Sequence, residues 1–134
     1  MMRFIKAAGA IMALLAMGTA VPVFAKNQIF TASIDKDGTI TTQSPQWIKE
    51  VKLTAQPDYF SDYKVRFIPG TFKEKPGFCT VSVIDVSSND HIFYGHAKLG
   101  SAPAINYVNV LTLKVGDNKP AGDSSMGFML MCSE

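Results

Sequence analysis

Hydrophobic and polar residues alternate along much of the chain, which is the pattern of β-strands that bury one face. The clearest case is the run in which Tyr63, Val65 and Phe67 alternate with charged residues. The same period of two recurs in residues 28–34 and 125–132. No window shows a convincing helical period. The pattern therefore predicts an all-β protein.

Turn signals separate the alternating segments every 8–12 residues. The pair Asp37-Gly38 is typical of a tight hairpin, and Pro69-Gly70 ends another segment. The long segment 105–115 is apolar enough to be buried on both faces. This spacing predicts an antiparallel, jelly-roll-like β-sandwich of about eight strands rather than alternating strands and helices. The expected strands are 28–34, 39–43, 47–53, 63–67, 78–86, 91–99, 105–115 and 125–132.

The first 25 residues have the architecture of a secretory signal peptide. A short basic start leads into an apolar run over residues 7–17, and small residues occupy the positions that a signal peptidase reads. The apolar run is shorter than the ~20 residues of a spanning helix, so we expect cleavage between Ala25 and Lys26 rather than an uncleaved anchor. Residues 26–134 should then form one domain without a membrane span, secreted or in a bacterial periplasm.

Cys79 and Cys132 are the two cysteines of the chain. In an oxidising compartment they are expected to form a disulfide, and the alternative is two buried free thiols. Strand parity places Cys132 on the face of Phe128, and Cys79 on the face of Val81. A bridge between them should therefore be buried, and it would stabilise the fold by about 4 kcal/mol in the chain-entropy model.

The charge balance argues against a nucleic-acid partner. The full chain has 13 basic and 11 acidic residues, but Arg3 and Lys6 belong to the leader. Without them the charges balance, and no basic stripe remains for a nucleic acid to follow.

Candidate catalytic and metal-binding groups are sparse. His91 and His96 would point to opposite faces of one strand, so they cannot bind one metal together. Residues 35–38 look like the start of a calcium loop, but Gln46 stands where the glutamate of that loop is required. There is no G-x-S-x-G motif and no evident carboxylate pair. We therefore expect a protein that is not an enzyme and that has no cofactor.

Aromatic and polar side chains are the best candidates for a binding surface. Tyr59 and Phe60 are adjacent in a predicted loop, where both cannot easily face a core. Exposed loop aromatics stack on sugars or anchor protein partners, although this loop could instead fold back to cap one end of the sandwich. Tyr94, His96 and Lys98 share one face of a predicted strand. That face is either a binding surface or the solvated side of a sheet.

Four sequence motifs follow one another along the chain: Trp47-Ile48, residues 63–72 (YKVRFIPGTF), residues 76–79 (PGFC) and residues 128–132 (FMLMC). In this order they resemble a family of small β-sandwich modules at the C-terminal ends of phage tail-fibre-like and related bacterial surface proteins. The resemblance covers about residues 38–134 and implies a β-sandwich without catalytic residues. One extra residue precedes Cys79 relative to the family pattern, and the family module usually ends a long fibre.

These features favour a secreted or periplasmic binding module that recognises a glycan or a protein at the cell surface. Two alternatives stay open. One is a structural subunit of a fimbrial or other surface assembly that pairs through an exposed strand edge. The other is a small periplasmic inhibitor or immunity protein. The sequence leaves the oligomeric state undecided.

Overall fold

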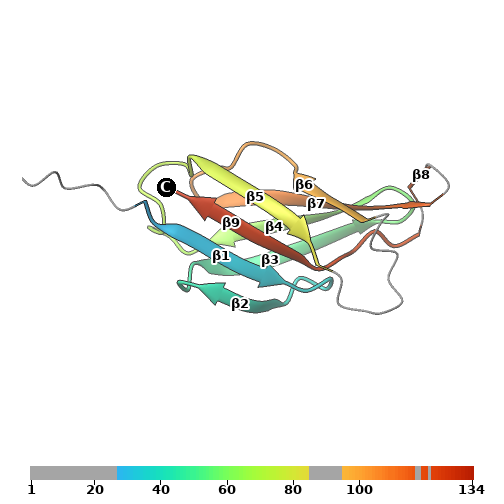
Figure 1. Cartoon of the computed structure of the whole chain (residues 1–134), viewed down its shortest axis with the longest axis horizontal. Helices are drawn as coiled ribbons and strands as arrows, with labels where there is room; N and C mark the ends of the chain where they lie inside the picture. Colours follow the sequence, from blue (N-terminus) through green and yellow to red (C-terminus); the bar gives the residue numbers. More distant parts are fainter. Residues whose placement is uncertain (1–26, 85–94, 117–118, 121) are drawn as a thin grey trace, which may run out of the picture.

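The computed structural model describes residues 27–84, 95–116, 119–120 and 122–134 (Figure 1). The expected leader, its cleavage site between Ala25 and Lys26, and both His91 and Tyr94 lie outside the described residues. The described residues form strands and connecting turns, with no helix among them. No described segment could therefore cross a membrane as a helix.

The strands form two antiparallel sheets, as the sequence predicts. Sheet 1 has the order β2-β1-β9-β5, and sheet 2 has the order β3-β4-β7-β6. The predicted antiparallel sandwich of about eight strands is confirmed, with a two-residue strand β8 added beside β7. Sheet 1 contains β1 (Ile29–Ile34), β2 (Ile40–Ser44), β5 (Phe78–Val83) and β9 (Phe128–Ser133). Sheet 2 contains β3 (Ile48–Gln56), β4 (Phe60–Phe67), β6 (Gly95–Leu99) and β7 (Tyr107–Gly116), and β8 is Lys119–Pro120.

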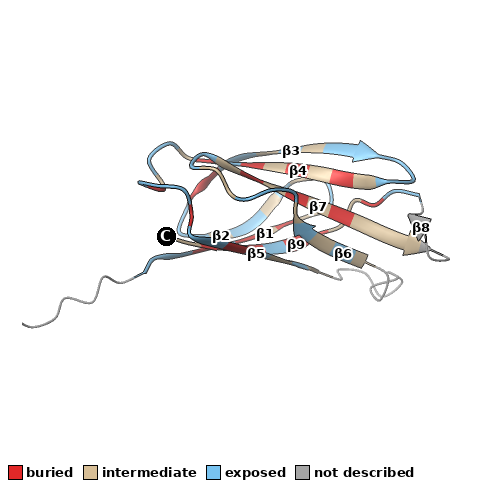
Figure 2. Cartoon of the chain, turned by 90° about the horizontal axis from the view of Figure 1, so that it is seen from above, coloured by how far each residue is buried: buried red, intermediate tan, exposed pale blue. Residues whose placement is uncertain are grey.

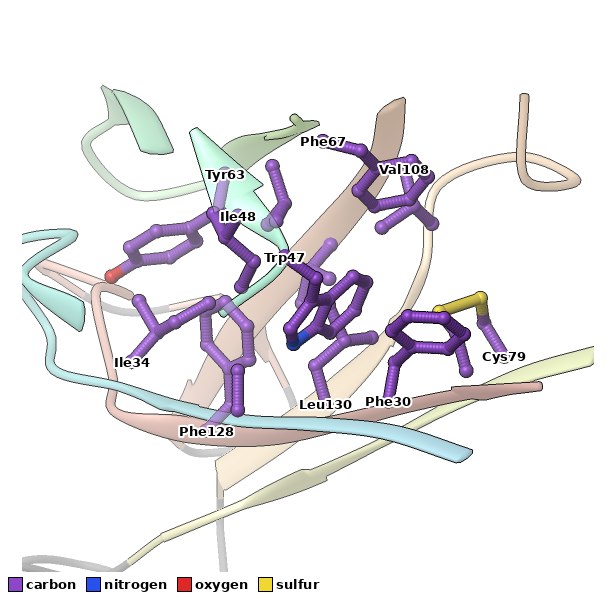
Figure 3. Packing of buried hydrophobic residues seen from close by; sticks show 14 of the residues in the cluster. Phe30, Ile34, Trp47, Ile48, Tyr63, Phe67, Cys79, Val108, Phe128 and Leu130 are labelled. Carbon is purple, nitrogen blue, oxygen red and sulfur yellow. A yellow bond between two sulfur atoms is a disulfide. The ribbon is translucent and has the colours of Figure 1, made fainter. Parts of the chain in front are cut away.

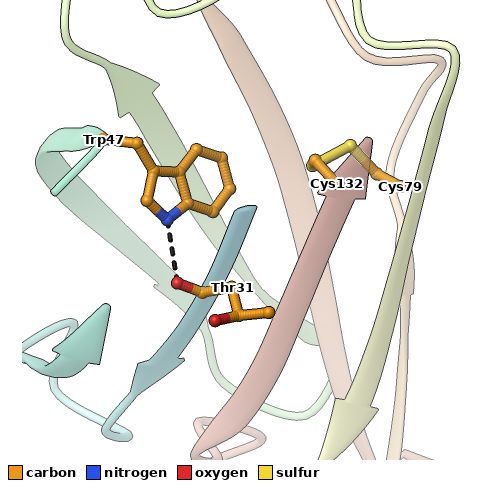
Figure 4. Close-up of a disulfide and its surroundings, with 4 residues drawn as sticks. All are labelled: Thr31, Trp47, Cys79 and Cys132. Atoms are coloured by element: carbon orange, nitrogen blue, oxygen red, sulfur yellow. Dashed lines mark hydrogen bonds between the residues drawn. A yellow bond between two sulfur atoms is a disulfide. The ribbon is translucent and has the colours of Figure 1, made fainter. Parts of the chain in front are cut away.

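Buried residues alternate with half-buried or exposed residues along most strands, so the core lies between the two sheets (Figure 2). Trp47, which directly precedes β3, is fully buried at the centre of an aromatic group (Figure 3). Its ring lies 5.6 Å from that of Phe30 in sheet 1 and 5.3 Å from that of Phe67 in sheet 2. Its indole N–H donates to the Thr31 carbonyl of β1 at 2.9 Å (Figure 4). One side chain thus joins both sheets by packing and by a hydrogen bond.

The predicted Asp37-Gly38 turn connects β1 to β2. Gly38 has a φ of +88°, a conformation that glycine adopts without steric cost, and its N–H donates to the Asp35 carbonyl at 2.9 Å. The Asp37 carboxylate accepts from the Thr39 N–H at 2.9 Å, and this bond lowers the pKa of Asp37. A hairpin turn therefore accounts for the residues that resemble the start of a calcium loop.

The disulfide between Cys79 and Cys132 is present and buried, as expected. The two residues are register partners in the neighbouring strands β5 and β9, so the bridge lies within sheet 1 and faces the core (Figure 4). No free thiol remains, because the chain has no other cysteine.

The expectation that the segment 105–115 is buried on both faces is wrong. The strand β7 buries Val108, Val110 and Thr112 against sheet 1, whereas Leu111 and Leu113 are half-buried on the outer face of sheet 2. No other described strand forms a third layer over that face. The outward apolar side chains of β7 are consequently open to solvent.

Candidate functional site

A hollow of about 490 Å³ opens on the outer face of sheet 2, at the end where β4 begins. Its floor is apolar, and its rim combines an exposed aromatic ring with an imidazole and an ammonium group. Its lining residues are Tyr59, Phe60, His96, Ala97, Lys98, Leu111 and Leu113.

Strand register brings the floor and one wall of the hollow together. Leu111 pairs with Lys98, and Leu113 pairs with His96, across the antiparallel β6–β7 ladder. Since the alternate β7 residue Thr112 is buried in the core, these pairs face outward. Phe60 at the start of β4 lies on the other side of β7, next to Leu113 in register order. Three strands thus contribute to one apolar floor.

A tight turn from Gln56 to Phe60 places Tyr59 on the rim. The Tyr59 N–H donates to the Gln56 carbonyl at 3.1 Å, and Asp58 at its centre has a φ of 60°. Two further bonds tie the turn to Gly122: the Asp58 N–H donates to the Gly122 carbonyl at 3.0 Å, and the Gly122 N–H donates to the Asp58 carboxylate at 2.8 Å. The backbone that carries the Tyr59 ring is therefore held at several points.

Tyr59 and Phe60 stand as an edge-to-face aromatic pair, with ring centroids 4.5 Å apart and planes inclined by 60°. Tyr59 is 58% exposed, and Phe60 is half-buried as the first residue of β4. Neither belongs to the core, so these rings do not cap the end of the sandwich. Their mutual contact keeps the exposed ring of Tyr59 beside the hollow.

Four of the five residues singled out from the sequence meet around this hollow: Tyr59, Phe60, His96 and Lys98. The fifth, Tyr94, lies outside the described residues. The sequence placed these residues in two unrelated groups. Their meeting depends on the β4–β7–β6 pairing, which joins segments far apart in the chain.

Sequence reasoning missed Ala97, Leu111 and Leu113 as parts of the site. The signal was present in β7, where the two leucines have the parity opposite to Val108 and Val110. The hydrophobic pattern of an apolar strand is the same whether its second face is covered or only half-buried. The pattern alone therefore did not separate the two cases.

Two further polar side chains lie on the same outer face, beside the hollow. Asp62 is the register partner of Leu111, and Asn109 is two residues before Leu111 on β7. Each has a buried side-chain oxygen that accepts no hydrogen bond from the described part of the chain. Burial raises the pKa of Asp62, and the charge of Lys64 partly opposes this rise. Both oxygens are covered by neighbouring groups, and neither residue belongs to the lining of the hollow.

Farther along the same face the side chains pair with one another. The Lys64 ammonium lies 4.3 Å from the centroid of the Tyr107 ring, and Arg66 Nε lies 3.3 Å from Glu50 Oε1. Among the described residues, no group of histidine, cysteine and carboxylate side chains is arranged to hold a metal ion. Neither the Lys64–Tyr107 contact nor the Arg66–Glu50 ion pair involves a residue that lines the hollow.

Comparison of the chain with models of protein families, with curated proteins and with solved structures found no match. The resemblance to the terminal modules of tail-fibre-like proteins therefore stays a prediction. The case for function rests on the geometry of the hollow.

Proposed function

We propose that the protein is a secreted or periplasmic binding module that takes up a cell-surface glycan in the hollow of sheet 2. The observation that carries this proposal is the convergence of an exposed aromatic ring, Tyr59, with the polar groups of His96 and Lys98 around one apolar floor. The buried disulfide and the expected leader support export from the cytoplasm.

The chemistry of a sugar ring matches this arrangement. A pyranose has apolar C–H faces and a rim of hydroxyl groups, so it can stack on an aromatic ring while it forms hydrogen bonds at its edge. Tyr59 offers the ring face, and His96 and Lys98 offer polar contacts at the rim. The volume of the hollow, about 490 Å³, is within the usual range for small-ligand sites.

We propose binding rather than catalysis because the lining side chains lack the parts of a known hydrolytic site. The two carboxyl groups that glycoside hydrolysis uses would have to flank the ligand. The lining contains an imidazole, an ammonium and a phenol group, and Asp62 lies beside the hollow rather than in its lining. A serine or cysteine nucleophile is likewise not among the lining residues.

A glycan array probed with the exported protein tests the proposal. The wild type should bind a defined set of glycans, and Tyr59→Ala should lose at least about tenfold in apparent affinity for them. Ile105→Ala is the matched control, because Ile105 is a hydrophobic residue of similar exposure, 51%, that lies outside both the lining of the hollow and the strands of sheet 1. This control should bind like the wild type.

An array with no binding, or one on which Tyr59→Ala equals the wild type, would contradict the proposal. If the array is negative and the protein instead captures a surface protein in a manner that depends on Tyr59, the ligand class is wrong and the site is right.

A further inference from the structure

Charged residues are distributed unequally between the two sheets. The strands β1, β2, β5 and β9 of sheet 1 contain no lysine, arginine, aspartate, glutamate or histidine. The strands of sheet 2 contain nine such residues: Lys49, Glu50, Lys52, Asp62, Lys64, Arg66, His96, Lys98 and Lys114. Charged side chains on solvated sheet surfaces keep proteins from associating, and sheet 1 lacks this protection.

Sheet 1 also carries four of the six large hydrophobic side chains that are exposed in the described part of the chain. They are Ile29 (57%), Phe78 (56%), Met129 (55%) and Met131 (38%). Their alternate neighbours Phe30, Cys79, Leu130 and Cys132 are buried, so all four project from the outer face.

The register arranges these side chains as a continuous surface. The central strand β9 places Met131 between Thr31 and Thr80, and it places Met129 between Ser33 and Ser82. At the open end Ile29 and Phe78 flank Ser133. The outer face of sheet 1 is therefore an uncharged surface of apolar and hydroxyl side chains, with two methionines at its middle.

We propose that this face binds a second copy of the chain, so that two molecules associate through their sheets 1. A two-fold interface brings the same patch of each copy together, and any charge near its axis would meet its own like charge. The four strands of sheet 1 contribute no charge that would repel the copy. Depletion of charge and enrichment of methionine and aromatic residues are also the composition of interface cores.

The size of the face determines the strength that we expect. Four strands at ~4.8 Å spacing, each about six residues long, give a footprint of roughly 20 by 20 Å, or about 400 Å². Stable complexes bury about 800 Å² of accessible surface per partner. The dimer should therefore be weak and dependent on concentration rather than permanent.

This inference does not depend on the glycan proposal, because the hollow lies on the outer face of the other sheet. Association through sheet 1 would leave the two hollows on opposite outer surfaces of the dimer. Such a dimer presents its two hollows in opposite directions, so it could join two glycan-bearing surfaces that face each other, and it gains no avidity on a single surface.

Sedimentation equilibrium of the exported, disulfide-bonded protein tests the inference from low micromolar to millimolar concentration. The average mass of the wild type should rise from that of a monomer toward that of a dimer. Met129→Lys and Met129→Glu should each stay monomeric, and an equimolar mixture of the two should associate again. Thr54→Lys is the matched control, since it adds the same charge to an exposed position of sheet 2 and should associate like the wild type.

Thermal unfolding followed by circular dichroism checks that the Met129 variants are folded, as expected for a change at an exposed position whose register neighbours are serines. Methyl NMR gives a second readout that needs no variant. The methyl signals of Met129 and Met131 should shift with concentration, and that of Met126, which precedes β9 and belongs to no strand of sheet 1, should not.

A wild type that stays monomeric at millimolar concentration would overturn the inference. So would dimers that the Met129 charges leave intact, or methyl shifts at Met126 alone. Binding of the monomer to neutral phosphatidylcholine vesicles, abolished by Met129→Lys, would show that a lipid surface rather than a second copy covers the face.

Discussion

Replacing Cys79 and Cys132 together by alanine should remove a large part of the stability of the fold. The disulfide spans a sequence separation of 53 residues, for which the chain-entropy model gives about 4 kcal/mol. A domain of this size has a total of about 5–15 kcal/mol, so the loss is a substantial fraction. Alanine is preferable to serine, because both positions are buried and a buried hydroxyl without a partner would add its own cost.

Urea unfolding followed by tryptophan fluorescence suits this measurement. Trp47 is the one tryptophan of the chain and is fully buried, so its emission reports the loss of the core. The free energy of unfolding should fall by about 4 kcal/mol, and the unfolding midpoint temperature by about 15 °C. The free energy of unfolding should fall more steeply with urea concentration, because the unfolded chain expands when the cross-link is absent.

Wild-type protein reduced with dithiothreitol is the matched control, and it should lose a similar amount of stability. A loss below about 1 kcal/mol in both samples would refute the reasoning. It would mean that the unfolded chain is already compact over this loop without its cross-link.

Three further predictions concern the core, a turn and an acidic side chain. Trp47→Phe removes the donor to the Thr31 carbonyl and leaves a cavity, so the free energy of unfolding should fall by about 3 kcal/mol. Urea unfolding followed by circular dichroism measures this loss, and an unchanged unfolding midpoint would contradict the bridging role of the indole. Gly38→Ala places a Cβ at a φ of +88° and should cost about 1 kcal/mol in thermal unfolding, and a stabilised variant would show that the turn relaxes. The Ser125 N–H donates to the Asp123 carboxylate at 2.9 Å, and this bond lowers the pKa of Asp123 in the folded protein. The stabilisation from this bond is therefore present above the pKa of Asp123 in the unfolded chain, about 4, and it is lost as the pH falls through the lower pKa of the folded protein. Asp123→Ala should therefore lose less stability than the wild type between pH 5 and pH 2 in urea unfolding, and parallel pH profiles would count against this hydrogen bond.

The strands were predictable because the period of two is a local property of the chain. The alternation of Tyr63, Val65 and Phe67 with polar residues indicates one buried face, and this holds whichever strand lies beside it. The two cysteines likewise indicated a bridge, since a chain with a single pair of cysteines has one pairing available. The order of the strands in each sheet could not be predicted from the sequence, because it depends on contacts between residues far apart in the chain. The pairing of β1 with β9, for example, appears only in the folded sheet.

The same limit applies to the site. Parity correctly placed His96 and Lys98 on one outward face, whereas the sequence left open whether the Tyr59 ring is exposed or caps the sandwich. That the two groups share a hollow follows from the non-local position of β7 between β4 and β6. The absence of charge from sheet 1 is present in the sequence as well, but it becomes a property of one surface only when the strand order is known.

The most direct test of the account is to map the ligand on the protein by NMR. Isotope-labelled protein is titrated with a glycan that the array identifies, and the backbone signals that shift are located on the fold. These signals should cluster at residues 59–60, 96–98 and 111–113, around the hollow. Shifts centred on the outer face of sheet 1, or on residues 68–77, would contradict the claim that the hollow of sheet 2 is the binding site.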